Sequence, residues 1–465
     1  MKICSLYGVG FYYIPGTDMC IKIGGWVRAE AAYHVNGSST RVTQGDVNNR
    51  FTNDLWYRVR GYITADARSQ TEYGTVRGYL ALGISTDTLL DPPQTFNANR
   101  AFIQWAGLTF GRAQSFFDFY SQAAVGYLGF APNSDTGDGD WEVLAYTAQL
   151  GNGFSASLSL EARRTTQLIG AVGTSITGGD SINGNAGFGG AGLSGASNGY
   201  AGWKVPDIVA NLRVDQAWGS AAIAGALHQV NAPYYVNTPG LVNPEGSGHP
   251  DDEWGFAVMA GLRLNTPMIG QGDYLQLQAI YTHGALRYLM QNPNSNWWYQ
   301  DGQSAAFGIL SDGVYGGSVP LENATNIQLT TAWGINASYE HFWNPRWRTS
   351  LYGGYADVSY NGLANAILCT AMANGAFGAG IFAVATTGCS NDWSSWWIGS
   401  RTQWNVTKEF YLGVDIAYQK LNTMTTATGS VLSTVVVPTT TSTPKTFADE
   451  DNWMVRFRVH RDFYP

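Results

Sequence analysis

The sequence is poor in charge. Charged residues make up 13% of its 465 residues, against about 25% in a typical soluble domain. It also lacks any apolar run of about 18 residues, the length that indicates a transmembrane helix. The net charge of −8 disfavours nucleic acid, whose phosphates attract basic surfaces. These absences exclude a helical membrane protein, disfavour a nucleic-acid-binding protein, and make an ordinary soluble domain a poor fit.

Cysteine is also scarce. The four cysteines form two local pairs in the sequence, Cys4 with Cys20 and Cys369 with Cys389. Four cysteines allow three connectivities, and the local pairing is favoured because each pair closes a short loop that contains glycine. Disulfides are typical of the periplasm or the cell surface. A zinc site is the weaker alternative, because neither a CxxC motif nor paired histidines accompany these cysteines.

Catalytic motifs are missing as well. No GxSxG, HExxH or phosphate-binding loop occurs in a strand-to-helix context, and the histidines are scattered along the chain. A barrel hydrolase would need a Ser/His/Asp grouping that the sequence does not mark. We therefore predict that the protein is not an enzyme and needs no cofactor. The six histidines are His34, His228, His249, His283, His341 and His460.

Glycine and aromatic residues are abundant, with 57 glycines and an aromatic fraction of 14%. The clearest pattern is in Leu55–Arg68, where apolar or small residues alternate with polar ones that include three arginines. This alternation is the period of a β-strand, whose successive side chains point to opposite faces. The run is longer than a common soluble strand and suits a tilted strand of about 9–11 residues that crosses a bilayer. We expect the apolar set to face lipid and the arginines to face water inside a closed barrel.

The same pattern recurs along the whole chain. It predicts a single domain over residues 1–465, an all-β transmembrane antiparallel barrel of 16 strands with short turns on one side and long loops on the other. The alternative is a large secreted β-sandwich or a carbohydrate-active β-protein. The predicted strands are Ile21–His34, Leu55–Arg68, Thr75–Ser85, Arg100–Ala106, Thr109–Phe116, Trp141–Leu150, Phe154–Arg163, Val205–Trp218, Ala221–Val230, Glu253–Leu264, Tyr274–Leu289, Gln328–Phe342, Arg346–Tyr360, Trp393–Val406, Phe410–Leu421 and Asn452–Asp462.

Arginines gather in the inward register of the first three strands and the last. The last strand of a closed barrel pairs with the first, so all of these arginines are predicted to lie on one wall. Adjacent cations repel one another unless water or opposite charge compensates them. The alternative is that each arginine is paired locally, with Glu30 or Asp66 for instance. The predicted basic wall is Arg28, Arg58, Arg60, Arg77, Arg456 and Arg458.

The segment Gly111–Glu142 carries the opposite charge and many aromatic residues. An exposed loop seldom carries so many aromatics, so we predict that the segment folds into the barrel and narrows it. Charged rings and walls select ions in pores. The alternatives are a loop packed outside the barrel at a subunit contact, or a calcium site in Asn133–Asp140, although that run lacks the full twelve-residue calcium pattern. The predicted acidic rim is Asp118, Asp135, Asp138 and Asp140.

Three stretches resemble a known family. They read KICSLYGVGFYYIPGTDMCIKIGGWVR near the N-terminus, RAFIQWAGLTFGRAQSFFD at Arg100–Asp118, and VRFRVHRDF near the end. Together they are similar to alphaproteobacterial outer-membrane porins, over the whole chain. The resemblance implies a sixteen-stranded barrel, a homotrimer, and a third external loop bent inward, here Phe116–Trp141. One departure is that Tyr464 is followed by Pro465, where porins generally end on an aromatic residue.

The resemblance and the residue pattern together predict a passive diffusion channel for small hydrophilic solutes in the bacterial outer membrane. The expected partners are outer-membrane lipid, lipopolysaccharide and two further copies of the chain. A substrate-selective channel for a sugar or an organic anion is the nearest alternative. A stack of aromatic side chains leading through the constriction would favour it.

Overall fold

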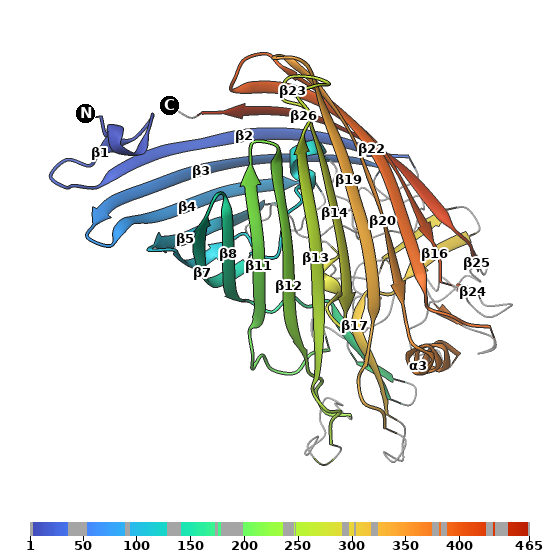
Figure 1. Cartoon of the computed structure of the whole chain (residues 1–465). Helices are drawn as coiled ribbons and strands as arrows, with labels where there is room; N and C mark the ends of the chain where they lie inside the picture. The colour runs from blue at the N-terminus through green and yellow to red at the C-terminus, as the bar shows by residue number, and fades with distance from the viewer. Residues whose placement is uncertain are drawn as a thin grey trace.

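The computed structural model describes residues 3–35, 54–88, 94–127, 141–172, 175–177, 199–235, 246, 248–290, 297–301, 304–317, 324–373, 381–382, 388–424, 431–432 and 445–463. Within them, sixteen antiparallel strands form one closed barrel, because β26 pairs with β2 (Figure 1). The prediction of a 16-stranded barrel is confirmed. The strands are β2 (Cys20–His34), β3 (Leu55–Thr71), β4 (Gly74–Asp87), β5 (Gln94–Trp105), β6 (Leu108–Ala113), β7 (Trp141–Gly151), β8 (Phe154–Glu161), β11 (Asp207–Gln216), β12 (Gly219–Val230), β13 (Glu253–Asn265), β14 (Tyr274–His283), β19 (Thr331–Asn344), β20 (Trp347–Ser359), β22 (Trp393–Asn405), β23 (Phe410–Asn422) and β26 (Glu450–Asp462).

The outer surface of the barrel is apolar. On β3, Tyr57 and Ile63 are 51% and 62% exposed, whereas Trp56 and Tyr62 in the other register are 4% and 7% exposed. β-Branched and aromatic residues suit extended backbone, and an apolar outer band is what a bilayer requires of a barrel. The predicted direction of the two registers is therefore confirmed on this strand.

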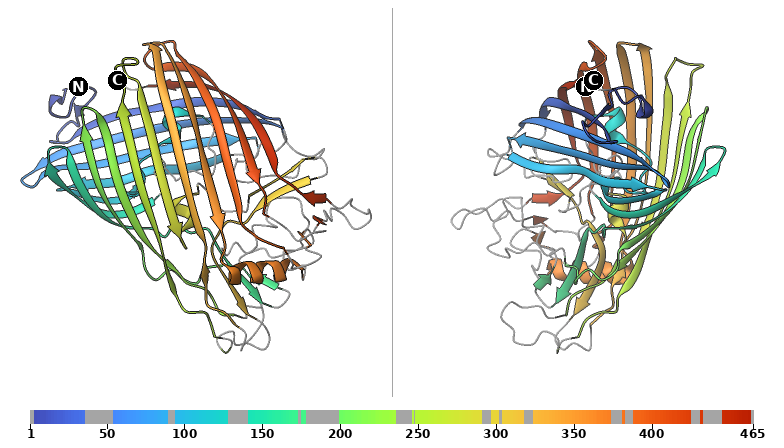
Figure 2. Two further views of the ribbon diagram at one scale, coloured as in Figure 1. Left: turned by 45° about the vertical axis from the view of Figure 1, so that its right-hand side comes forward. Right: turned by 90° about the vertical axis from the view of Figure 1, so that its left-hand side faces the viewer.

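Short turns join the strands at one end of the barrel. The turn between β7 and β8 places Asn152 and Gly153 at φ of 49° and 77°, the left-handed conformation that two-residue hairpins need. A Cβ atom on Gly153 would lie 2.1 Å from the carbonyl oxygen of Asp215. The N-terminal segment and the end of β26 lie at this same short-turn end (Figure 2).

Two small sheets and a helix lie at the long-loop end (Figure 2). None of the helices in the described residues is both long and apolar enough to cross a membrane. Strand β14 ends at His283, short of the predicted Leu289, because the apolar residues that follow turn into η3 (Leu286–Tyr288) and are buried among the loops. The small elements are β9 (Gln167–Val172), β10 (Ser175–Thr177), β17 (Ser311–Gly317) and β18 (Gln328–Leu329) in one sheet, β15 (Trp297–Asp301), β16 (Ser304–Gly308), β21 (Ile381–Phe382), β24 (Val431–Leu432) and β25 (Lys445–Phe447) in the other, and α3 (Gly362–Ala373).

These loops pack an apolar core against one side of the barrel's inner wall. Inward residues of β12, β13 and β20, such as Ala224, Ala257 and Ala356, are nearly inaccessible and join Leu286 and Phe307 in one buried cluster. From Ala222 to Ala226, strand β12 is therefore apolar on both faces, unlike β3. Because apolar side chains are stabilised by leaving water, this side of the long-loop half is packed with protein.

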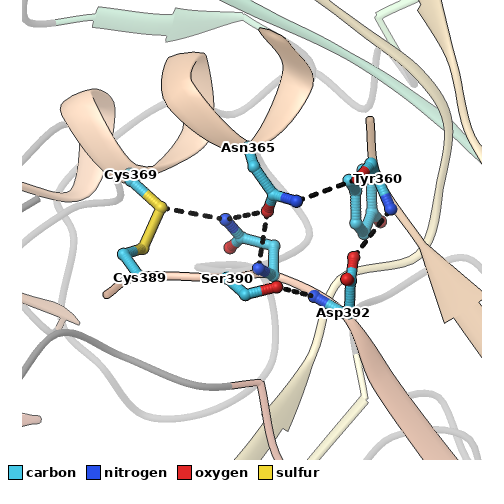
Figure 3. Close-up of a disulfide and its surroundings, with 7 residues drawn as sticks. Tyr360, Asn365, Cys369, Cys389, Ser390 and Asp392 are labelled. Atoms are coloured by element: carbon cyan, nitrogen blue, oxygen red, sulfur yellow. Dashed lines mark hydrogen bonds between the residues drawn. A yellow bond between two sulfur atoms is a disulfide. The ribbon is translucent and has the colours of Figure 1, made fainter. Parts of the chain in front are cut away.

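Both predicted disulfides are present, and they lie at opposite ends of the barrel. Cys4–Cys20 ties the N-terminal segment to the start of β2. Cys369–Cys389 ties α3 to the chain that enters β22. Figure 3 shows Asn365 on α3 beside this second disulfide, where it bonds the backbone of Tyr360 and of Asn391.

Candidate functional site

Five of the six predicted arginines lie together on the inner wall of β2, β3 and β26. Arg28 lies directly across from Arg60 in the β2–β3 pairing. Arg458 and Arg456 occupy the same side of β26, opposite Glu30 and Ala32 of β2. We call these five residues the arginine cluster: Arg28, Arg58, Arg60, Arg456 and Arg458.

Arg77 is not brought into this cluster. It lies across from Arg68, eight positions along β3 from Arg60, a separation of roughly 26 Å at about 3.3 Å per residue. Asp66 accepts hydrogen bonds from both Arg68 and Arg77, with nearest distances of 2.7 and 3.0 Å. The alternative that an arginine is paired locally with Asp66 is therefore confirmed for Arg77, which lies near the short-turn end.

The wall supplies part of the opposite charge itself. Glu30 lies 2.7 Å from Arg458, 3.2 Å from Arg60 and 3.8 Å from Arg456. Asp87 pairs with Arg58 at 3.0 Å. Two carboxylates set against the five guanidinium groups of the arginine cluster leave a net charge of three positive units. Arg60 remains the more exposed, at 26% for its side chain compared with 15% for Arg58.

Trp56 organises the outer edge of the cluster. The guanidinium of Arg58 lies 4.8 Å from the centre of its ring and that of Arg456 lies 4.4 Å away. Its indole Nε1 donates a hydrogen bond to Asp87, which also accepts from Arg58. Cation–π contacts of this kind orient guanidinium groups. Sequence reasoning missed Trp56 and Asp87, although both occupy the register of the arginines.

His460 fixes Arg28. The Nε–H of Arg28 donates to Nδ1 of His460 at 3.2 Å, and Nε2 of His460 lies 3.1 Å from Asp462. Arginine has no acceptor, so Nδ1 of His460 is unprotonated and the imidazole is neutral in this arrangement. The histidine ring also stacks on Tyr411 at 4.8 Å. Arg458 lies two positions from His460 on the same strand, β26.

Aromatic rings continue along the wall beside the arginines. Trp26 stacks on Tyr62 with centroids 4.7 Å apart and planes at 22°, and it lies 5.4 Å from His460. Tyr411 stacks between His460 and Tyr127. These rings come from neighbouring strands, so the row runs around the wall. The rings turn their faces toward one another.

Residues 114–127, between β6 and β7, reach from one wall of the barrel to the opposite wall; we call them the crossing segment. The segment includes the short helix α1 (Gln122–Val125). Its backbone is bonded to inward-register side chains of successive strands. In order from β11 to β26, these hydrogen bonds join Asn211 with Phe116, Gln278 with Tyr120, Ser350 with Val125, Arg401 with Ala124, Asp415 with Tyr127, and Arg456 with Tyr127.

Asp118 anchors the near end of the crossing segment. Both carboxylate oxygens accept from Arg164, at 3.2 and 3.1 Å, and both side chains are fully buried. Asp118 is thus screened from the arginine cluster. The other predicted acids, Asp135, Asp138 and Asp140, lie outside the described residues, as does the Asn133–Asp140 run considered for calcium. No group of three or more metal-binding side chains is placed to hold an ion in the part of the chain that is described.

A buried polar network connects this anchor to the long-loop elements. The backbone N–H of Arg164 and the hydroxyl of Tyr288 both donate to Asp207, whose other oxygen pairs with His228 at 2.8 Å. His228 is bonded to Tyr200, and Tyr200 donates to Asp312 at 2.7 Å. Burial raises the pKa of Asp312, in β17. Sequence reasoning gave no signal for this network, because its members come from strands and loops that lie far apart in the sequence.

The comparisons agree with this architecture. Porin Omp2b of Brucella melitensis is 28% identical over 235 residues, 48% of this chain and 55% of that protein, so the chain spans about half the length of the curated relatives it matches. The outer membrane channel DcaP of Acinetobacter baumannii shares the fold, with a TM-score of 0.60 and 14% identity over 97% of this chain and 99% of that one. OprB of Pseudomonas putida has a TM-score of 0.50 and 11% identity over 95% and 94%.

The match to a family model decides the assignment. It covers residues 1–455, nearly the whole chain, and the family is described as the Porin subfamily. The closed barrel with an apolar outer face is the structure expected of such a protein in the outer membrane. The chain belongs to the Porin subfamily, and its place is the bacterial outer membrane.

Proposed function

We propose that the protein is a passive channel through which small hydrophilic solutes and ions diffuse across the outer membrane, with a preference for anions. One observation carries this proposal: five arginines share one patch of the inner wall, and the ion pairs found there among the described residues come from two carboxylates, Glu30 and Asp87. A wall of one charge sign raises the local concentration of ions of the opposite sign. The solute's own gradient supplies the driving force, so no catalytic group is required.

The crossing segment would narrow the channel. Its hydrogen bonds to inward side chains from β11 round to β26 support this role. In the long-loop half of the barrel, the apolar core covers the inner wall at β12, β13 and β20, away from the arginine cluster. The constriction would therefore lie between the crossing segment and Arg28, Arg58 and Arg60 of the arginine cluster, and Asp135, Asp138 and Asp140 would supply the acids of its rim.

The aromatic row supports general diffusion over a sugar-selective channel. A sugar track needs ring faces that are open to the solute along the direction of transport. Trp26 and Tyr62 instead stack face to face on each other, and so do His460 and Tyr411. The row also follows the wall around the barrel, across strands, instead of leading through it.

Reconstitution in planar bilayers tests the proposal. We expect stepwise conductance in groups of three, since the protein would act as a homotrimer embedded in lipid and lipopolysaccharide. Under a salt gradient, the reversal potential should have the sign of an anion-preferring pore. An absence of conductance from folded, inserted protein would refute the channel, and a cation-preferring reversal potential would refute the role of the arginine cluster.

A further inference from the structure

At the end of the crossing segment that faces β22, β23 and β26, Tyr127 bonds all three strands through its backbone and its side chain. Its backbone N–H donates to Asp415 of β23 at 2.5 Å, and its hydroxyl donates to Gln403 of β22 at 2.9 Å. Its carbonyl oxygen accepts from Arg456 at 2.7 Å and from Arg458 at 3.4 Å. Three adjacent strands thus satisfy every polar group of a single residue.

The ring of Tyr127 also fits a steric socket. The guanidinium of Arg458 lies 4.0 Å from the ring centre. Beneath the ring is Gly413 of β23, where an added Cβ would lie 2.1 Å from the tyrosine oxygen and 2.7 Å from ring carbons. Real Cβ atoms do not approach so closely, and a ring held by three strands has little room to shift. Only glycine at position 413 therefore leaves room for the Tyr127 ring.

We propose that Tyr127 is a positioning residue that locks the crossing segment to the far wall and so sets the aperture of the channel. This inference rests on the proposed function. The members of the arginine cluster then have two different roles. Arg456 and Arg458 hold the lock by donating to the Tyr127 carbonyl, whereas Arg28, Arg58 and Arg60 make no contact of that kind among the described residues and act on passing ions.

Gly413→Ala tests the lock without altering any charge. It should expel the tyrosine ring, free the far end of the segment, and give a larger single-channel conductance with frequent current fluctuations. Gly78→Ala is the matched control, because a Cβ at Gly78 of β4 would meet nothing within 4 Å. Its channel should be as quiet as the wild type.

Tyr127→Phe is the milder variant, in case Gly413→Ala prevents folding. It keeps the ring and removes only the bond to Gln403, so we expect roughly a fivefold rise in the frequency of fluctuations, the factor given by one net hydrogen bond. Arg456→Gln should also raise fluctuations, and Arg60→Gln should not.

The outcomes separate this inference from the proposed function. Quiet wild-type channels together with noisy Gly413→Ala and Tyr127→Phe channels support the lock. Conductance and fluctuations that match the wild type in a Gly413→Ala or Tyr127→Phe protein that folds and inserts overturn it while leaving the diffusion channel intact. A wild-type protein that inserts and gives no conductance overturns both.

Discussion

Neutralising Arg60 should weaken the preference for anions by an amount that the structure allows us to work out. The Arg60 side chain is partly exposed on the inner wall, and its partner Glu30 keeps two other arginines within 4 Å. A unit charge about 5 Å from an ion in water contributes about 0.8 kcal/mol, which salt at 0.1 M, with a Debye length of about 10 Å, lowers to about 0.5 kcal/mol. The energies of an anion and a cation change with opposite signs.

Arg60→Gln should therefore change the ratio of anion to cation permeability by about 1 kcal/mol, or about fivefold, toward cations. Adding Arg58→Gln lowers the net charge of the cluster from three to one and should shift the ratio further in the same direction. Neighbouring charges couple, so the two shifts need not add.

The assay is the reversal potential in planar bilayers under a tenfold salt gradient, repeated at 1 M salt, where the Debye length of about 3 Å should shrink the effect. Arg77→Gln is the matched control. It removes the same charge from the same wall, roughly 26 Å away along the strands and beside the Asp66 pair. Equal shifts from the two variants, or no shift from Arg60→Gln, would refute the idea that the clustered arginines set selectivity.

Three further predictions address other parts of the molecule. Asp118→Asn removes the carboxylate that pairs with the buried guanidinium of Arg164, and breaking a buried ion pair costs about 3–5 kcal/mol; the urea midpoint should fall, and an added Arg164→Met should recover much of the loss, so an unchanged midpoint would contradict it. Cys369→Ser opens a link across 20 residues worth about 3 kcal/mol and should expose the α3 region to protease while the barrel stays folded, whereas Cys4→Ser should leave that region protected. Once the pH is low enough to protonate His460, its Nδ1 can no longer accept from Arg28, and the added charge should increase anion preference; His460→Gln should abolish this response in reversal potentials, and a response that persists would exclude His460 as its source.

The barrel could be predicted from the sequence because a bilayer imposes one rule on every strand. The outward side chain must be apolar, and the period of two then marks each strand independently. In β3 this rule separated Tyr57 and Ile63 from Arg58 and Arg60 without any knowledge of tertiary contacts. Strand ends obey no such rule, and the predicted extension of β14 to Leu289 was wrong because a buried loop core is as apolar as a lipid-facing strand.

The topology of a closed barrel was enough to group the arginines on one wall. Their charged partners could be found only from the register between neighbouring strands. The closure of the barrel brings Arg458 beside Glu30 whatever the details of the loops. Arg77 lies across from Arg68 of β3, which is eight positions from Arg60. Its distance from the cluster therefore depends on the register between β3 and β4, and counting these positions would have separated it. The pair of Asp118 with Arg164 could not be foreseen, because each residue lies in an irregular segment whose path is set by tertiary packing.

Composition of the inward register also distinguishes the two sides of the barrel. Along β19 it begins with Ala332 and Gly334 near the long loops and passes through Asn336 and Ser338 to Glu340. Small apolar residues at inward positions signal that protein, not water, covers them, and the buried cluster at Ala332 bears this out. A hydrated ion loses its water in such a core at a cost of several kcal/mol. In the proposed channel the long-loop half of this wall would therefore offer ions no route, whereas β2, β3 and β26 carry the arginine cluster in their inward register.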